Sequence, residues 1–424
     1  MTSTSALNGG QGSRGQGSSG QGSSGTGAWF AVLWVCLFII GSAEVVAGPM
    51  MTVMGAHFGV PSSRIALLPA AYGLVYAAVA LAAGPLADRF GRKQMLTAGL
   101  IGQAVTLSVL PHCGSLTIAV WLSGLAGCSA AIIQPNALTI VADQAPPDEI
   151  GRRLARVFVG LMASFVITPV VAGWMASGIG WQHAYHALGA TAFLCAIGVV
   201  ALCPPGKRGR PASFFATHGA ALRTPGVRSG LATSFLWLGC AAGFGAIVAN
   251  VAARSLPITT AGVGLIAAWF GFVVILGNLC GHALERRWPG RALPALAAAS
   301  AIGIALFALP AGSPCLLAVA GTPWAFGYGA AGPLHHARLN HLSERWRSTI
   351  NSYHASLLNL GIFAVSGLYA VMTPYLSPGW FCVVIAGLCF SGTVFMPGTG
   401  RSLARARLGS GDPRTNQPKK QGGV

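Results

Sequence analysis

The sequence predicts an all-α membrane protein in which twelve transmembrane helices form two pseudo-symmetric six-helix bundles. Three observations predict this fold class. Of the 424 residues, 53% are hydrophobic and only 8% are charged, whereas about a quarter are charged in soluble proteins. Long apolar runs alternate with short basic clusters, which is typical of a polytopic membrane protein. The loop motifs of the first half also return in the second half.

Twelve apolar runs have the length that a membrane crossing requires, because a hydrocarbon core about 30 Å thick needs roughly 20 apolar helical residues. In the first half they cover approximately residues 29–51, 65–86, 95–112, 116–142, 156–177 and 183–203. In the second half they cover approximately 230–253, 260–282, 292–310, 315–337, 350–373 and 380–397.

These runs divide the chain into five regions. A Gly/Ser/Gln tail over 1–27 is too polar to bury a core and is expected to be disordered. A first six-helix bundle over 28–204 and a second over 229–397 flank a central loop over 205–228, and a basic tail covers 398–424.

Lysine and arginine residues fix the expected orientation. With the N-terminus inside, 24 of the 26 fall in inside segments, and only Arg64 and Arg254 fall outside. Because basic residues concentrate in cytoplasmic loops, we expect a multi-pass protein of the cell membrane with both termini, the central loop and the basic tail in the cytoplasm. The same scatter of basic residues between apolar runs argues against a nucleic-acid partner.

The loop after the second run is the most specific motif in the chain. It reads Gly84-Pro-Leu-Ala-Asp88-Arg89-Phe-Gly91-Arg92, and an echo after the eighth run holds Glu285, Arg286 and Arg291. A second echo pairs Asp148-Glu149-Ile-Gly-Arg152 with Ser343-Glu344-Arg-Trp-Arg347. These echoes indicate a duplicated six-helix unit.

Glu44 is the only acidic residue well inside an apolar run. An ionisable group at mid-membrane raises the free energy of insertion by about 2.5–3.5 kcal/mol, so an ionisable side chain without a function is unexpected there. Burial favours the protonated form of a carboxyl group, which suits Glu44 to proton exchange or to substrate binding. A structural hydrogen bond to a neighbouring helix is the alternative.

Other polar or aromatic side chains within the runs are candidates to line a central cavity, or else to make interhelical hydrogen bonds. They are Tyr72, Tyr76, Gln134, Asn136, Asn278, Asn359 and Trp237. Four histidines lie near the cytoplasmic ends of the tenth and eleventh runs: His335, His336, His341 and His354. A packing or solvated role is favoured for them over proton relay.

No cofactor or metal site is expected. The ten cysteines lie mostly inside apolar runs without ligand spacing, which favours a packing role. Outside the Gly/Ser/Gln tail the sequence has no HExxH, GxSG or GxxxxGK[ST] motif, so neither an enzyme nor a self-contained ATP-driven pump is predicted, and a membrane enzyme or sensor is only a remote alternative.

The loop motif resembles that of the major facilitator superfamily, which reads G-x-L-a-D-r-x-G-r-k between helices 2 and 3. Phe38-Ile-Ile-Gly41-Ser42-Ala-Glu44 and the stretch 141–152 resemble drug and metabolite exporters of the twelve-helix proton-antiporter type, related to arabinose and chloramphenicol efflux proteins. The resemblance covers about residues 29–397.

The resemblance implies a conformational latch. In the family, the loop acid contacts an arginine near the end of helix 4 and the N-terminus of helix 11. The matching positions are Asp88, Arg152 or Arg153, and the segment 348–351. Latch residues expected on this basis are Gly84, Asp88, Arg89, Gly91, Arg92, Arg152, Glu285 and Arg291.

The predicted function is secondary active transport by alternating access, as a monomer, with proton-coupled export of a small amphipathic compound such as a drug, antibiotic or natural product. Efflux or exchange of a sugar-like or other polar metabolite is the alternative. The sequence leaves proton antiport and facilitated diffusion both open.

Overall fold

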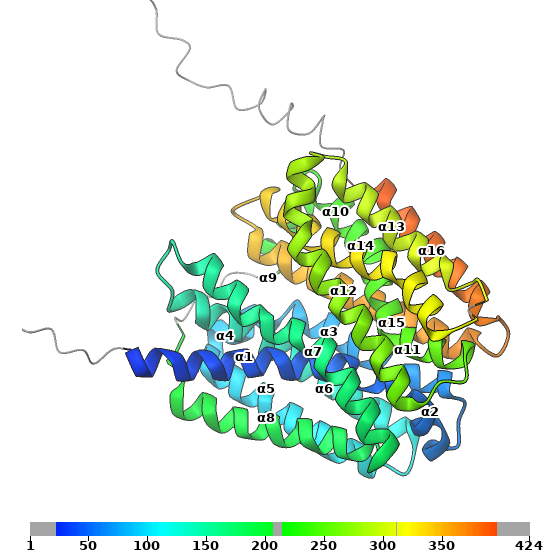
Figure 1. The fold of residues 1–424 in the computed structure, drawn as a ribbon. Helices are drawn as coiled ribbons and strands as arrows, with labels where there is room; N and C mark the ends of the chain where they lie inside the picture. Colours follow the sequence, from blue (N-terminus) through cyan, green and yellow to red (C-terminus); the bar gives the residue numbers. More distant parts are fainter. Residues whose placement is uncertain (1–22, 207–213, 311, 397–424) are drawn as a thin grey trace, which may run out of the picture.

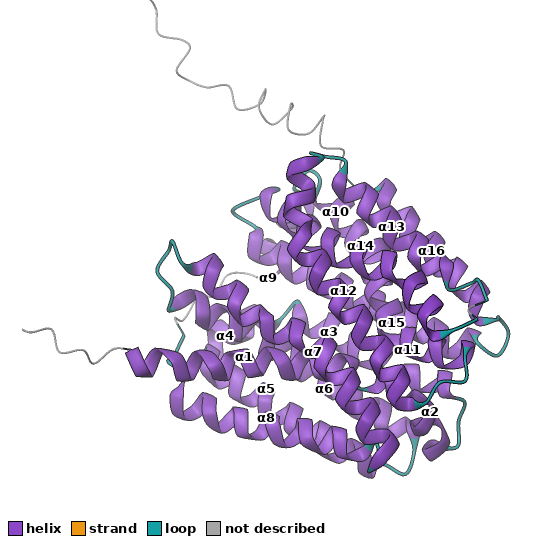
Figure 2. Cartoon of the chain, viewed as in Figure 1, coloured by secondary structure: helices purple, strands orange, loops and turns teal. Residues whose placement is uncertain are grey.

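The computed structural model describes residues 23–206, 214–310 and 312–396, and in these ranges every regular element is a helix (Figures 1 and 2). This confirms the predicted all-α class. Most of the predicted tails, 1–22 and 397–424, lie outside the described residues.

The first half comprises ten helical segments, several of which join into longer rods. They are α1 (Ser23–Val45), α2 (Ala47–Phe58), η1 (Ser62–Ala66), α3 (Leu67–Ala80), α4 (Ala83–Phe90), α5 (Arg92–Val109), η2 (Leu110–His112), α6 (Leu116–Asp143), α7 (Ile150–Gly178), followed by α8 (Gln182–Leu202) as the last membrane-length helix.

The second half begins with a short helix, α9 (Phe214–Arg223), inside the predicted central loop. It continues through α10 (Val227–Thr233), the π-helical η3 (Ser234–Gly239), α11 (Cys240–Ser255), α12 (Thr260–Arg287), α13 (Ala292–Leu306), α14 (Pro314–His341), α15 (Arg347–Met372) and α16 (Pro378–Val394).

Nine helical stretches in the described residues are long and apolar enough to cross a membrane. The apolar helices α13 and α16 are shorter, and α14 has 28 residues but three internal or terminal prolines and a polar end. With these three, the described helices are consistent with the twelve predicted runs.

Several boundaries differ from the sequence-based ranges. The first rod starts at Ser23, inside the predicted tail, and runs with one irregular residue at Val46 to Phe58. Pro49 has no N–H to donate to the carbonyl of Val45, which explains the local break without ending the rod. The predicted loop over 205–228 contains α9, which packs on α15 through Ala221 and Ile350.

The two halves form separate bundles. In the first, α1 packs on α6, α7 and α8, while α5 lies against α6 and α8; in the second, α14 packs on α12 and α13, and α16 on α13. Small residues allow these close approaches: a Cβ atom on Gly127 would overlap the carbonyl oxygen of Tyr72. One buried cluster lies within the first half, whereas another contains residues of both halves.

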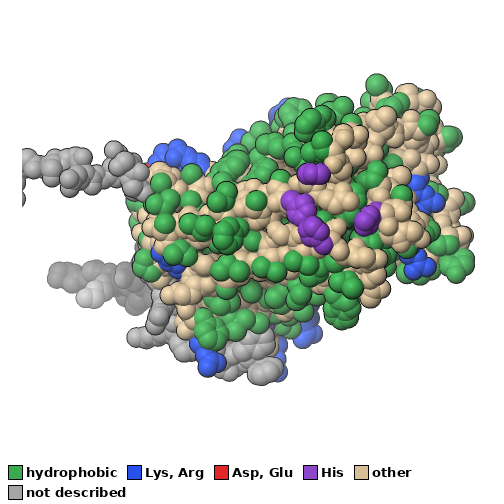
Figure 3. Space-filling view, turned by 90° about the horizontal axis from the view of Figure 1, so that it is seen from below, with side chains coloured by type: hydrophobic (Ala, Val, Ile, Leu, Met, Phe, Trp, Pro, Cys, Tyr) green, Lys and Arg blue, Asp and Glu red, His purple; other side chains and the backbone are tan. Residues whose placement is uncertain are grey.

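The outer surface is apolar. Trp121, Trp174 and Leu194 are all more than 60% exposed, and Figure 3 shows hydrophobic side chains over most of one lateral face, with lysine and arginine toward its edges. Such a surface fits lipid and would be unfavourable in water. The chain is therefore a multi-pass membrane protein.

The halves touch mainly at one end. We call the end with Ser23, α4 and α9 the terminal face, and the end with Gly59, Gly114 and Tyr375 the distal face. Contacts between the halves join α2 to α11, α3 to α15, and the distal part of α7 to α12. By contrast, α4 packs on α3, α5 and α6 of its own half. The halves therefore diverge toward the terminal face (Figure 1).

One ion pair near the terminal face ties α12 to α14. The Glu285 Oε1 atom accepts from the Arg338 guanidinium at 2.8 Å and from the Gly290 N–H at 3.1 Å, while Oε2 is buried without a partner. We expect Arg338→Gln to lower the free energy of unfolding by about 1–2 kcal/mol, because a partly buried carboxylate loses its charged partner. Urea unfolding in detergent measures this.

The control for that measurement is Arg347→Gln. Arg347 pairs at 3.9 Å with Glu344, whose side chain is 93% exposed, so its loss should change the stability by less than about 0.5 kcal/mol. Equal effects for the two variants would contradict a stabilising role for the Glu285–Arg338 pair.

Candidate functional site

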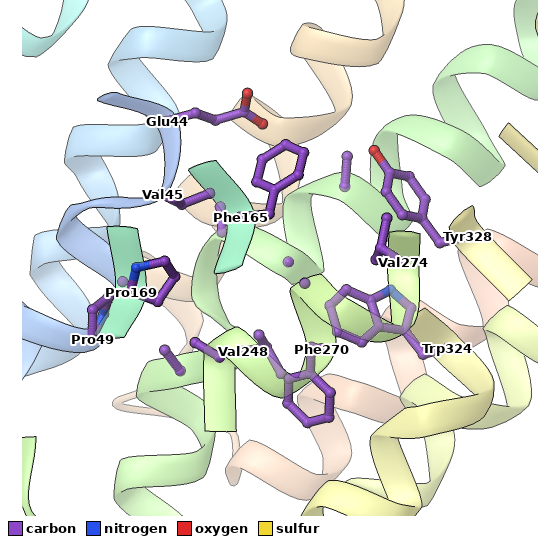
Figure 4. Close-up of a pocket in the computed structure, with 17 residues that line it drawn as sticks. Glu44, Val45, Pro49, Phe165, Pro169, Val248, Phe270, Val274, Trp324 and Tyr328 are labelled. Carbon is purple, nitrogen blue, oxygen red and sulfur yellow. The ribbon is translucent and has the colours of Figure 1, made fainter. Parts of the chain in front are cut away.

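A pocket lies between the two halves at mid-molecule, and five rods contribute to it (Figure 4). The lining residues come from the α1–α2 rod, α7, α11, α12 and α14. They are Glu44, Val45, Gly48, Pro49, Phe165, Pro169, Ala242, Gly245, Ala246, Val248, Ala249, Ala267, Phe270, Gly271, Val274, Trp324 and Tyr328.

Glu44 is the only charged residue of this lining. It lies near the end of α1, two residues before the irregular Val46, and is partly exposed to the pocket. No side chain among the described residues makes a hydrogen bond or ion pair with its carboxyl group. A structural hydrogen bond, the alternative raised by the sequence, is therefore absent in this conformation.

The wall opposite Glu44 is aromatic. The rings of Phe270 and Trp324 meet edge to face at 5.5 Å between centroids, and the Trp324 indole N–H donates to the Ala241 carbonyl at 3.2 Å, which fixes the ring. Figure 4 shows the Tyr328 hydroxyl on the same side of the pocket as the Glu44 carboxyl. The site thus offers one acid, one hydroxyl and a rigid apolar wall.

The sequence identified only part of this lining. Of the predicted cavity residues, Tyr72 lines a second pocket beside Glu44. The other predicted residues line neither this second pocket nor the pocket between the halves. The Tyr76 hydroxyl donates to the Gln134 side chain at 2.7 Å. The amides of Asn136 and Asn359 donate to backbone carbonyls of their own helices.

Two further predicted cavity residues lie away from the pocket. Asn278 is exposed on α12, and Trp237 is fully buried in η3 against Gly392. The lining residues that the sequence did not single out, such as Phe165, Phe270 and Tyr328, carry no signal that separates them from other aromatic residues in apolar runs.

The predicted latch residues are engaged within their own half. Asp88 pairs with Arg92 at 3.5 Å, and Arg92 also approaches Asp143 at 3.7 Å. Gly91 has φ +94°, which a turn between α4 and α5 requires. Arg89 stacks on Phe90, with its guanidinium 5.3 Å from the ring centroid.

The arginines expected to meet Asp88 pair elsewhere. Arg152 and Arg153 both contact Glu149, the latter at 2.9 Å. The hydrogen bond from Arg153 holds the pKa of the Glu149 carboxyl below its usual value. The predicted contact of Asp88 with Arg152 or Arg153 is thus not formed in this conformation.

The remaining latch residues lie in or directly before helices. Gly84 lies in α4 with open space around it. In the second half, Glu285 pairs with Arg338 as described above, and Arg291 is exposed before α13. Charged residues near the terminal face therefore form ion pairs in both halves.

Three of the four histidines, His335, His336 and His354, take part in a polar network within the second half, whereas His341 is exposed. The Ser234 hydroxyl lies 2.9 Å from both His335 Nε2 and His354 Nδ1, and His336 Nε2 lies 3.1 Å from Asn351 Oδ1. These contacts tie η3, α14 and α15 together. Among the described residues, no group of three or more His, Cys, Asp or Glu side chains is arranged to hold a metal ion.

All ten cysteines are free thiols. The Sγ atoms of Cys36 and Cys195 lie 3.4 Å apart between α1 and α8, and seven of the ten residues are buried. This agrees with the packing role that the sequence indicates.

Comparison with known proteins places this geometry in a family. The model of the Major Facilitator Superfamily matches residues 33–253, a little over half of the chain. The multi-drug resistance efflux pump PmrA of Streptococcus pneumoniae is 27% identical over 173 residues, covering 39% of this chain and 42% of that protein. The tetracenomycin C resistance and export protein of Streptomyces glaucescens is 30% identical over 115 residues, covering 27% of this chain and 21% of that protein.

The aligned segments span less than half the length of these relatives. Over the whole fold, a crystal structure of the nucleoside transporter NupG superposes with a TM-score of 0.72 at 14% sequence identity, covering 87% of this chain and 98% of that one. With its apolar rods, its two bundles and the family match, this chain belongs to the major facilitator superfamily.

Proposed function

We propose that this protein is a proton-driven exporter of small amphipathic compounds, in the class of drugs, antibiotics and natural products. The observation that carries the proposal is the single acid, Glu44, facing a rigid aromatic wall across the pocket between the halves. A compound with an apolar ring system and one cationic or hydrogen-bond-donating group matches this lining. Partial relatives with efflux and antibiotic-export names support the same class.

Proton coupling follows from competition at one carboxyl group. A carboxylate attracts a cationic or donor group of the substrate, and a protonated carboxyl group releases it. Because Glu44 lies at the boundary between the halves, alternating access exposes it to each side of the membrane in turn. Binding of a proton on one side and of substrate on the other then gives antiport.

The proposed orientation places the terminal face in the cytoplasm of a bacterial cell and the protein in the plasma membrane as a monomer. The distribution of basic residues supports it, since only Arg64 and Arg254 belong to distal segments. In this orientation the described conformation faces inward, because the halves touch in the distal half and diverge toward the terminal face.

Export or exchange of a polar metabolite is the second candidate. The Tyr328 hydroxyl beside Glu44 gives the pocket a small polar end, which would hold a sugar-like hydroxyl group. The largely apolar lining ranks this candidate below the amphipathic one.

Expression in an efflux-deficient bacterium tests the proposal. We expect cells with the transporter to accumulate less of one or more aromatic amphipathic cations than cells with an empty vector, and an uncoupler to remove the difference. Reduced accumulation that persists with the uncoupler would contradict proton coupling. Export of sugars or nucleosides, without export of any amphipathic compound in the panel, would favour the second candidate.

A further inference from the structure

A second pocket lies behind Glu44, inside the first half. Its lining is Ala43, Glu44, Ala47, Leu68, Pro69, Tyr72, Leu107, Leu110, Ser123, Ala126 and Tyr185. We propose that this pocket holds water bound to the Tyr72 and Tyr185 hydroxyls and is the compartment from which Glu44 takes up and releases its proton. The inference rests on the coupling role proposed for Glu44 and assigns a proton-side function to two tyrosines.

The polar groups of the pocket call for a ligand. The Tyr72 side chain is 3% exposed, and its hydroxyl has no hydrogen-bond partner among the residues that the structure describes. Tyr185 is equally buried and also lines the pocket. An unsatisfied buried hydroxyl costs about 1–3 kcal/mol, and a polar pocket next to such groups is where ordered water is found.

Ser123 adds a third polar group. Its hydroxyl donates to the Leu68 carbonyl at 2.8 Å, which fixes the side chain and leaves its oxygen lone pairs available to accept from water. Tyr72, Ser123 and Tyr185 come from α3, α6 and α8, so hydroxyl-bearing residues of three different helices line the pocket beside Glu44.

The position of the pocket separates protons from substrate. Leu68 lies at the start of α3, Leu110 at the end of the α5–η2 rod and Tyr185 at the start of α8, all in the distal part of the first bundle. The substrate pocket lies on the other side of Glu44, against the second half. One carboxyl group therefore has an aqueous side within the first bundle and a substrate side between the bundles.

The proton step is simple. A hydronium ion in the pocket gives its proton to an oxygen of the Glu44 carboxylate and remains as water, and the reverse step releases the proton. The only other ionisable side chains lining the two pockets are Tyr72, Tyr185 and Tyr328, so no other charged group competes for the proton. Leu107 and Leu110 form an apolar wall on the distal side, which limits a continuous path of water and thus a leak.

Infrared difference spectroscopy of the reconstituted protein tests the inference without a substrate. A pH step should produce a carbonyl-stretch band of protonated Glu44, identified by its loss in Glu44→Gln. We expect Tyr72→Phe and Tyr185→Phe to shift this band to higher wavenumber, because the protonated carboxyl group loses hydrogen-bonded water. Tyr369→Phe is the control, since that hydroxyl donates to Asn250 in the second half, at 2.8 Å, and lines neither pocket.

The outcomes are distinct. A Glu44 band that is the same in wild type, Tyr72→Phe and Tyr185→Phe would overturn the hydrated pocket, and so would the absence of any band that Glu44→Gln removes. Band shifts in both variants, together with no export of any compound by the wild type, would support the pocket and reject the proposed export. Thermal unfolding of each variant confirms that the isosteric substitutions leave the fold intact.

Discussion

Replacing Glu44 by glutamine is expected to abolish proton-driven transport. Glutamine has nearly the same shape but neither loses a proton nor carries a negative charge, so Glu44→Gln keeps the pocket and removes the exchange at its only acid. We expect uphill export into inverted membrane vesicles to fall by at least about tenfold, the change that corresponds to 1.4 kcal/mol at the rate-limiting step. Fluorescence of an accumulated dye and of a pH indicator measures transport and proton movement together.

The control is the same chemical change at an exposed acid. Glu344 has a side chain that is 93% exposed and lies outside both pockets, so Glu344→Gln should transport as the wild type does. Proton movement of wild-type size in Glu44→Gln would exclude Glu44 as the coupling group and leave facilitated diffusion as the explanation of any residual flux.

The sequence predicted the fold better than it predicted the site. Apolar length and basic clusters are local signals, and they located the runs that became α3, α6, α12 and the other rods, with errors of a few residues at breaks such as Val46. Glu44 was also predictable, because a single acid in an apolar run needs a reason to be there.

The walls of the pocket were not predictable in the same way. Phe165, Phe270 and Trp324 lie in runs with many other aromatic residues, and which of them face the cavity depends on how the helices rotate against one another. Trp237 shows the converse. It is as aromatic as Trp324, but the π-helical segment η3 turns it into the interior of the second half.

The latch residues illustrate a further limit of prediction from sequence. One sequence is compatible with every conformation of the protein, so a contact that it suggests need not be present in each of them. Asp88 and Arg152 satisfy the family pattern, yet in this structure they pair with Arg92 and Glu149 respectively and not with each other. A contact that must break during transport is absent from some conformations by necessity, so the latch role of Asp88 stays a prediction for the closed terminal face.

The distal contact between α7 and α12 provides a direct test of alternating access. A Cβ atom on Gly264 would overlap the carbonyl oxygen of Pro169 in the other half. We therefore expect Gly264→Val to push the halves apart at the distal face and to favour the conformation that is open there. Overpacking costs about 1–3 kcal/mol, which changes the ratio of the two conformations by about 5- to 150-fold.

Double electron–electron resonance measures this shift in a variant without native cysteines. The spin labels are attached at Gly114→Cys and Tyr375→Cys, on the distal ends of the two halves. Gly178→Val is the matched control, because Gly178 lies on the same helix as Pro169 but has nothing within 4 Å of its Cβ position. We expect longer label distances only in Gly264→Val. If the distances stay unchanged while the variant remains folded, the α7–α12 contact does not govern distal closure, and the packing of α2 on α11 becomes the element that holds this face shut.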